Sequence, residues 1–327
     1  MPKRVIDLRD QKPLLDMVTH ARKGRQLTPE QYQRISLTIR RVPEVMVKVS
    51  GGAHSLAGVK RHMKYIGRDG ELGMETDLST HVGGPQFEQD LAEDWDLDLE
   101  TLSRQSERGI RRRRPGKLVH NLIFSMPPGT PPKKVLEAVR KLAINEWQQR
   151  HRYAMALHTD TDHPHVHVVL KAVSEQGERL NIRKATLRSW RSQFAAHLRE
   201  LGVPANATER AVRGQTRISQ SDARFRMDAR QHIPGMPDRS HRAGAHSVDA
   251  GGVPNAAIER MRRTRVDVLD GWHRTAALLR ARGDHTVADL IRAFTLGMKQ
   301  PGDGLERTTD ADRGGARELT HDYDRSR

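Results

Sequence analysis

Four histidines and two aspartates lie within ten residues near the middle of the chain, in the segment YAMALHTDTDHPHVHVVLKAV (residues 153–173). An apolar run precedes this cluster, a β-branched run follows it, and Pro164 lies in the short acidic segment between the runs. This pattern predicts two strands joined by a turn. Because side chains alternate along a strand, His165 and His167 point to the same face. We expect His158, on the adjoining strand, to complete a group of three imidazoles.

Three imidazoles at this spacing suit a divalent metal ion. Three neutral nitrogen ligands leave coordination positions open, which favours a catalytic ion over a closed structural site. The simpler alternative is an ordinary strand with surface or hydrogen-bonded histidines. The third histidine and the nearby carboxylates Asp160 and Asp162 favour the ligand cluster.

A tyrosine in a second segment has surroundings that suit phosphate chemistry. Residues 54–66 have one apolar stripe, which predicts an amphipathic helix. Tyr65 lies off that stripe and shares a helix face with Arg61 and Arg68. Nearby positive charge favours the phenolate that a nucleophile needs. An exposed tyrosine beside arginines is common, so these residues alone leave an ordinary surface role open.

The charge of the whole chain indicates a polyanionic partner. The 327 residues have a formal net charge of +16 and include no cysteine. Nucleic acid is the commonest partner of so basic a protein, although a merely soluble basic protein or one that touches acidic membranes has the same composition. The lack of cysteine excludes disulfides and thiolate metal sites within this sequence. With no long apolar run and no signal-peptide pattern in residues 1–10, we expect a soluble, cytoplasmic protein.

Composition and periodicity divide the chain into five segments. Residues 1–41 predict an N-terminal helical extension, in which Thr28 caps a helix. The segments that follow are a central domain, a linker rich in glycine and polar residues, a small helical region and a disordered tail, over residues 42–218, 219–252, 253–299 and 300–327.

The central domain is expected to have an α+β fold. Strands are predicted at residues 42–50 and 117–125, before the two histidine strands, and helices lie between and after them. This order favours a central, mostly antiparallel sheet with helices on one face and the opposite face open for the histidines and a substrate. Ser125 ends the second strand, where its hydroxyl could hold a phosphate or, equally well, satisfy the backbone of the turn.

Together these residues resemble the mobilisation relaxases of conjugative plasmids (MOBP-like), including the type that nicks T-DNA borders, within the HUH endonuclease superfamily. In the first matching block, VKVSGGAHSLAGVKRHMKYIGRDGEL, Tyr65 falls at the family's nucleophilic tyrosine. The second block, HNLIFSMPPGTPPKKVL, has a serine that contributes to DNA binding in the family, here Ser125. The third, ALHTDTDHPHVHVVL, is the metal motif with its three histidines and is the most specific of the three.

The resemblance covers roughly residues 42–215 and includes departures from the family pattern. Lys171 stands where close relatives have asparagine, and the nucleophile lies later in the chain because of the N-terminal extension. No helicase or primase segment follows the nuclease region in this sequence. Unwinding of DNA would therefore need other proteins.

The resemblance implies a DNA relaxase that nicks one strand at an origin of transfer. Mg²⁺ or Mn²⁺ would be held by His158, His165 and His167 and would polarise the scissile phosphate. Tyr65 would attack the phosphorus, leaving a 3′-hydroxyl and a 5′-phosphotyrosine that allows the strand to be rejoined.

The remaining site residues have roles that the resemblance only suggests. Asp160 or Asp162 would orient a ligand imidazole or help to remove the tyrosine proton, and the sequence does not choose between them. Arg61 and Arg68, with Ser125, would contact DNA. His163 is assigned to the edge of the site.

The resemblance also suggests partners, and it leaves rival functions open. An accessory relaxosome protein or the coupling protein of a type IV secretion channel would dock on the C-terminal helices, and the protein would be exported with the transferred strand. Rolling-circle replication initiators and transposases of the HUH type share the same chemistry. A non-enzymatic basic DNA-binding protein and a phosphohydrolase that acts through water are further alternatives.

Overall fold

The computed structural model describes residues 27–78, 83–84, 86–97, 116–215 and 255–298. Two compact units account for these residues. The first unit runs from Val42 to Ala207, and the second combines residues 27–41 with residues 208–215 and 255–298. The expected linker at 219–252 and the expected tail at 300–327 lie outside the described residues.

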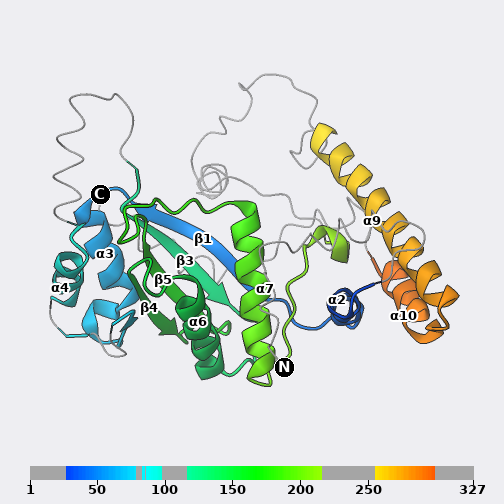
Figure 1. Ribbon diagram of the computed structural model, residues 1–327, viewed down its shortest axis with the longest axis horizontal. Coiled ribbons are helices and arrows are strands. Elements are labelled where there is room, and N and C mark those ends of the chain that lie inside the picture. The colour runs from blue at the N-terminus through cyan, green and yellow to red at the C-terminus, as the bar shows by residue number, and fades with distance from the viewer. Residues whose placement is uncertain (1–26, 79–82, 85, 98–115, 216–254, 299–327) are drawn as a thin grey trace, which may run out of the picture. The chain divides into compact units, whose positions relative to one another are not determined.

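A five-stranded sheet forms the centre of the first unit (Figure 1). The strand order is β1-β3-β5-β4-β2, and every pairing between these strands is antiparallel. The strands are β1 (Met46–Ala53), β2 (Glu75–Thr76), β3 (Val119–Ser125), β4 (Tyr153–His158) and β5 (His165–Lys171). All seven residues of β5 are buried, because this strand lies in the middle of the sheet. The expected α+β fold with a central antiparallel sheet is confirmed.

Strand β1 lies later in the chain than the sequence predicted, because it begins at Met46 rather than at Val42. The pair Gly51-Gly52 indicated a strand end at Ser50, but β1 continues to Ala53. An irregularity between Val49 and Gly51 shifts the register, after which Gly51 pairs with Asn121 of β3. A bulge of this kind lets the strand continue through a glycine pair that would otherwise end it.

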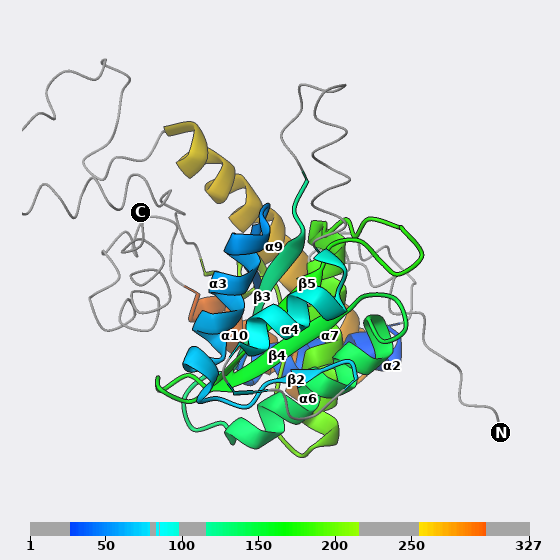
Figure 2. The same ribbon diagram turned by 90° about the vertical axis from the view of Figure 1, so that its left-hand side faces the viewer.

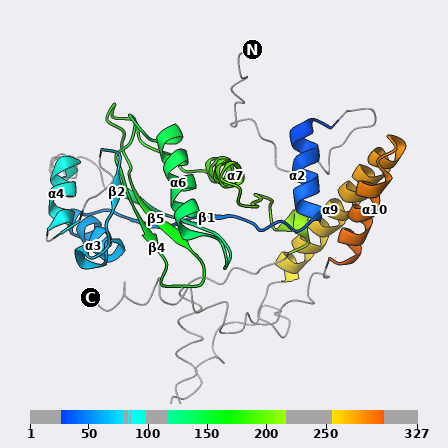
Figure 3. The same ribbon diagram turned by 90° about the horizontal axis from the view of Figure 1, so that it is seen from below.

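Two long helices cover one face of the sheet. Helix α6 (Pro132–Glu146) and helix α7 (Lys184–Glu200) lie on the side to which Val166, Val168 and Leu170 point (Figure 3). Aromatic rings fill the space between the layers: Trp147 packs edge-on against Phe124 and Trp190, with ring centroids 6.2 and 5.4 Å away. This layer forms the main core of the unit.

Two shorter helices cover part of the opposite face. Helix α3 (Leu56–Ile66) and helix α4 (Phe87–Asp94) lie in front of the sheet in Figure 2. Their buried side chains share a core with Ala154, Ala156 and Val169, which lie in β4 and β5 on the histidine face of the sheet. Short alanine side chains let a helix approach the strands closely. The open part of this face is therefore smaller than the sequence suggested.

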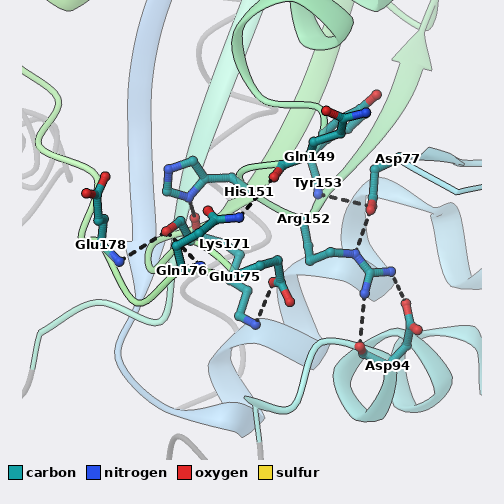
Figure 4. Close-up of polar contacts among 11 residues, drawn as sticks. Asp77, Asp94, Gln149, His151, Arg152, Tyr153, Lys171, Glu175, Gln176 and Glu178 are labelled. Carbon is teal, nitrogen blue, oxygen red and sulfur yellow. Dashed lines mark hydrogen bonds and ion pairs between the residues drawn. The ribbon is translucent and has the colours of Figure 1, made fainter.

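Arg152, a partly buried residue directly before β4, links this strand to α4 and to the segment that follows β2 (Figure 4). The Nε atom of Arg152 donates to Asp77 at 2.6 Å, and its guanidinium also forms an ion pair with Asp94. The same figure shows Lys171, a departure from the pattern that the resemblance leads us to expect, paired with Glu175 at 3.1 Å. Lys171 lies at the opposite end of β5 from His165, so this departure is remote from the histidine cluster.

The second unit is helical. Helix α2 (Pro29–Ile39) begins with the expected Thr28 cap. Helices α9 (Asn255–Ala281) and α10 (His285–Leu296) pack against each other. Ile35 and Ile39 of α2 are buried in the same cluster as residues of α9 and α10. Trp272 Nε1 donates to the Val212 carbonyl at 2.9 Å. Segments from the two ends of the chain thus build one core. No helix in the described part of the chain is both long and apolar enough to cross a membrane.

Candidate metal and nucleophile site

Three buried imidazoles meet at one end of the β4–β5 pair. His158 pairs with His165 across the two strands, and His167 lies two residues further along β5 on the same face. One ring nitrogen of each lies within 4.8 Å of those of the other two. The three side chains are only 1–4% exposed. The alternation predicted from the sequence therefore brings all three expected ligands together.

Backbone carbonyls fix how two of the rings are turned. His158 Nε2 lies 2.8 Å from the Ile66 carbonyl, and His165 Nδ1 lies 2.9 Å from the His163 carbonyl. A carbonyl can only accept, so each of these nitrogens carries the proton. The lone pairs are then on Nδ1 of His158 and Nε2 of His165. Backbone hydrogen bonds of this kind commonly orient metal-binding histidines.

Three other ring nitrogens of the triad lack a hydrogen-bond partner within the described residues. Among the described residues, neither ring nitrogen of His167 has a hydrogen-bond partner, and neither does His165 Nε2. Buried polar atoms nearly always have a partner, so an unmet group in a folded protein calls for an explanation. A bound cation would supply the missing partner.

The electrostatic environment keeps these histidines neutral. Burial lowers the pKa of His158 and of His165. Burial, together with the neighbouring histidines, lowers the pKa of His167 to about 2. Metal ligands must be deprotonated, so neutral imidazoles at neutral pH are the form that a cation needs. Three neutral nitrogen donors within reach of one point fit a divalent ion with open positions.

Tyr65 lies beside this triad although it comes from a distant part of the sequence. Its partly buried ring has its centroid 6.1 Å from that of His167 and 6.4 Å from that of His158. His62, one turn earlier on α3, stacks on Tyr65 at 6.0 Å. The packing of α3 onto the alanines of β4 brings the tyrosine to this position.

Arg68 and Asp160 form an ion pair at the edge of the triad. The Arg68 guanidinium lies 5.4 Å from the centre of the Tyr65 ring and pairs with the Asp160 carboxylate. Its Nη2 atom also lies 3.5 Å from His158 Nδ1. Asp162 is exposed, and no hydrogen bond joins it to the triad among the described residues. Of the two candidate aspartates, the structure brings only Asp160 into this network.

The remaining predicted residues surround the same site at different depths. Ser125 pairs with His165 in the sheet register and is 5% exposed, so its side chain shares the histidine face. Its hydroxyl lies 3.4 Å from the carbonyl of the next residue. Arg61 is exposed, one turn before Tyr65 on α3. His163 is exposed, and its backbone carbonyl rather than its ring contacts the triad.

Two residues at the site were not singled out from the sequence. His62 is 6% exposed and lies edge-on to His167, with centroids 6.4 Å apart. Lys48 of β1 pairs with Ile123, which in turn pairs with His167, so all three lie in one row on the same face. The alternation of Lys48 with Val47 and Val49 was visible in the sequence, but its alignment with the triad depends on the strand order.

Comparison with known proteins assigns the class of the domain that holds the triad. Residues 80–203 match the family model of the relaxase nuclease domain, MobA/VirD2-like. This region contains all three histidines and Ser125 and begins after Tyr65. These residues are thus similar to a relaxase nuclease domain of the HUH type, which supports the resemblance found in the sequence.

A curated relative agrees with this assignment. The T-DNA border endonuclease VirD2 of Rhizobium radiobacter is 27% identical over 194 residues, which is 55% of this chain. The match spans 43% of the relative, so this chain corresponds to less than half of its length. Among solved structures, a chain from the study "Molecular Basis of Vancomycin Resistance Transfer in Staphylococcus aureus" is 16% identical. That match covers 31% of this chain and 63% of the other with a TM-score of 0.24, which is too low to carry an argument.

Proposed function

We propose that this chain is a relaxase that nicks one DNA strand at an origin of transfer, with Tyr65 as the nucleophile and a divalent ion at the histidine triad. The observation that carries the proposal is the approach of the Tyr65 ring to within 6.1 Å of His167 and 6.4 Å of His158. The phenol and the three buried imidazoles come from distant parts of the sequence and meet at one end of the β4–β5 pair. Their convergence fits transfer of a phosphoryl group to tyrosine.

The proposed reaction is an exchange of phosphoesters. A bond forms between Tyr65 Oη and the phosphorus, and the bond from the phosphorus to the 3′ oxygen breaks. The proton lost by Tyr65 is balanced by the one that the 3′ oxygen gains. Nothing is hydrolysed, so the phosphotyrosine can be attacked by a 3′-hydroxyl and the strand rejoined. Asp160, held near the tyrosine through Arg68, is the better placed carboxylate to assist proton transfer.

His158, His165 and His167 are the residues that would hold the divalent ion. When bound, such an ion polarises a phosphoryl oxygen and offsets its charge. Imidazole suits transition metals, whereas Mg²⁺ prefers oxygen ligands. Of the two ions expected from the sequence, the donor set therefore favours Mn²⁺.

Basic and polar side chains on the histidine face are proposed to contact the DNA strand. Arg61 is exposed beside Tyr65, and Lys48 and Ser125 lie on the same sheet face as the triad. The formal net charge of +16 supports a polyanionic substrate. We further propose that the helical unit binds an accessory relaxosome protein or a secretion coupling protein, and that the protein acts in the cytoplasm before export with the strand.

Covalent attachment of DNA to the protein tests this function. A single-stranded origin-of-transfer oligonucleotide is labelled at its 3′ end, so that the label stays on the segment that becomes linked to tyrosine. With Mn²⁺, the wild type should give a labelled protein band that resists denaturation. Tyr65→Phe should reduce this band by at least about 10³-fold, because phenylalanine has no nucleophilic oxygen. Tyr32→Phe, which removes a hydroxyl from the helical unit, is the matched control and should behave as the wild type.

The other outcomes of the same assay distinguish the rival functions. Cleavage without a protein-bound label would indicate a water-dependent phosphohydrolase. An unchanged band for Tyr65→Phe would show that another residue is the nucleophile. Binding of the oligonucleotide with no cleavage under any metal condition would favour the non-enzymatic DNA-binding protein. A preference for a replication origin over an origin of transfer would favour an initiator.

A further inference from the structure

The turn after α3 aims two groups at the same imidazole. The Ile66 carbonyl accepts from His158 Nε2, and two residues later the Arg68 side chain returns to the other nitrogen of that ring. Arg68 and the next residue, Asp69, have φ values of 49° and 56°. Consecutive non-glycine residues in this left-handed region carry a local energetic cost, and such strain often occurs at functional sites. The backbone is therefore bent in a way that directs Arg68 toward the triad.

Only one atom of His158 is available to bind a cation. Because Nε2 donates to the backbone, the lone pair is on Nδ1. A guanidinium has no acceptor, so the Arg68 Nη2 atom at 3.5 Å from Nδ1 can only be a donor to this lone pair. The same Nη2 atom contacts Asp160 Oδ2. The positive side chain thus faces the atom that a metal ion would need.

Arg68 also has space into which it can move. Its side chain is 34% exposed and that of Asp160 is 44% exposed, whereas His158 is buried. A guanidinium can rotate outward on its flexible stem while it keeps its carboxylate partner. The outer side of the pair is also the side open to a solvent-borne phosphate.

We propose that Arg68 is a displaceable internal cation, an inference that rests on the proposed metal site. Without a divalent ion, the guanidinium donates to Nδ1 of His158. When the ion binds, Arg68 leaves this nitrogen, stays on Asp160 and becomes free to contact a DNA phosphate near Tyr65. Metal binding to the DNA-free protein is consequently weakened by competition with Arg68. By linkage, a phosphate that binds Arg68 strengthens metal binding by the same factor by which the metal strengthens binding of that phosphate.

The affinity of the DNA-free protein for Mn²⁺ tests this competition. We would measure it by titration calorimetry for the full chain, for Arg68→Met and for Lys64→Met. Methionine keeps an unbranched stem of similar length and cannot donate to His158. Lys64 provides the matched control, because it lies in the last turn of α3 only four residues before Arg68, pairs with Asp69 at 3.5 Å and is 54% exposed. Both variants lose one positive charge, but only one loses the contact with Nδ1.

Arg68→Met should bind Mn²⁺ about tenfold more tightly than the wild type, as expected for loss of a competing hydrogen bond from a charged group. Lys64→Met should change the affinity by less than about twofold, because exposed charges are screened. Equal affinity of the wild type and Arg68→Met would overturn the proposal while leaving the triad as a metal site. An equal gain in both variants would also overturn it, since the effect would then be one of bulk charge.

A second measurement covers the case in which Arg68→Met does not fold. In the wild type, the Nε–H resonance of Arg68 should shift during titration with diamagnetic Zn²⁺. Half of the total shift should be reached when the concentration of free Zn²⁺ equals its dissociation constant. A resonance that stays still while the metal binds would overturn the proposal. Failure of the wild type and both variants to bind any divalent ion would overturn the metal site itself and this inference with it.

Discussion

The backbone hydrogen bonds of individual histidines determine which of their atoms can do chemistry. His158 and His165 each give one proton to a carbonyl, which turns the other nitrogen toward a common point. The ring nitrogens of His167 make no hydrogen bond within the described residues, and its pKa is the most strongly lowered of the three. The triad is thus held by two oriented rings and completed by a third ring whose nitrogens remain unsatisfied without a ligand.

At the same scale, the two aspartates of the motif should differ in importance. Asp160 pairs with Arg68 above Tyr65, whereas Asp162 is exposed and not joined to this network. We expect Asp160→Asn to lower the rate of adduct formation by about 10²-fold, the usual size of an acid–base or positioning contribution. The rate for Asp162→Asn, which removes the same charge two residues away, should stay within about threefold of the wild type. Single-turnover nicking kinetics would measure both rates.

A larger loss of rate for Asp162→Asn than for Asp160→Asn would contradict this prediction. Asp162 would then have to reach the site in the DNA complex, and the pairing of Asp160 with Arg68 would have no role in the reaction. Equal losses in the two variants would instead indicate a general effect of negative charge near the metal. Measurement of the Mn²⁺ affinity of both variants would separate that effect from one on the tyrosine.

The helices on the two faces of the sheet have different roles: one layer forms the main core, and the other positions Tyr65. Helices α6 and α7 bury the aromatic core on one face, far from the chemistry. Helices α3 and α4 form a thinner layer on the other face, and α3 carries Tyr65. Arg152 is one polar connection between this layer and the sheet, through Asp77 and Asp94.

Arg152→Met should therefore destabilise the layer that positions Tyr65. The side chains of Arg152 and Asp77 are 13% and 9% exposed, so loss of the arginine leaves a largely buried carboxylate without its cation. We expect the free energy of unfolding to fall by about 3 kcal/mol, the lower end for breaking a buried ion pair. Urea denaturation would measure this change, and adduct formation should fall with it.

The matched control for this prediction is Lys141→Met. Lys141 also pairs with one carboxylate, that of Glu200 at 3.7 Å, but the two side chains are 39% and 57% exposed. Its loss should cost less than about 1 kcal/mol. Similar costs for the two variants would mean that the Arg152 cluster contributes no more than a surface ion pair.

The stability of the whole molecule should depend on pH through two histidines whose pKa folding lowers. Burial lowers the pKa of His62 to about 4, and burial together with Lys117 and Arg179 lowers that of His120 to about 4. In the unfolded chain these groups titrate near about 6.5, so between these values the unfolded state binds more protons. Stability therefore rises with pH through this window and is lost as the pH falls from about 6.5 towards 4.

The urea midpoint, measured in the presence of a chelator, should be lower at pH 5 than at pH 7. His120 lies outside the triad, so His120→Asn should make the difference between the two midpoints smaller without affecting Mn²⁺ binding at pH 7. A midpoint that is the same at both pH values would show that these histidines take up protons without unfolding the sheet.

Local sequence predicted the individual helices of the helical unit but not their packing. The capping box at Thr28 and the apolar stripes of the C-terminal helices are local signals, and these helices form. Their shared core is not local, because Ile35 and Ile39 are more than 200 residues away from the α9 and α10 residues with which they pack. Periodicity identifies the apolar face of a helix but not the partner of that face.

The sequence by itself predicted the triad. Alternation places His165 and His167 on one face of β5, and a short turn places His158 of β4 beside them. The sequence also determined the antiparallel α+β character of the domain, through the order of its strands and helices. Only the tertiary structure decided that Tyr65 meets the triad, that Arg68 and Asp160 stand at its edge, and that Lys48 lies in line with His167. These contacts depend on strand order, a register shift in β1 and the packing of α3 on small side chains, and each of these is set by interactions between residues far apart in the chain.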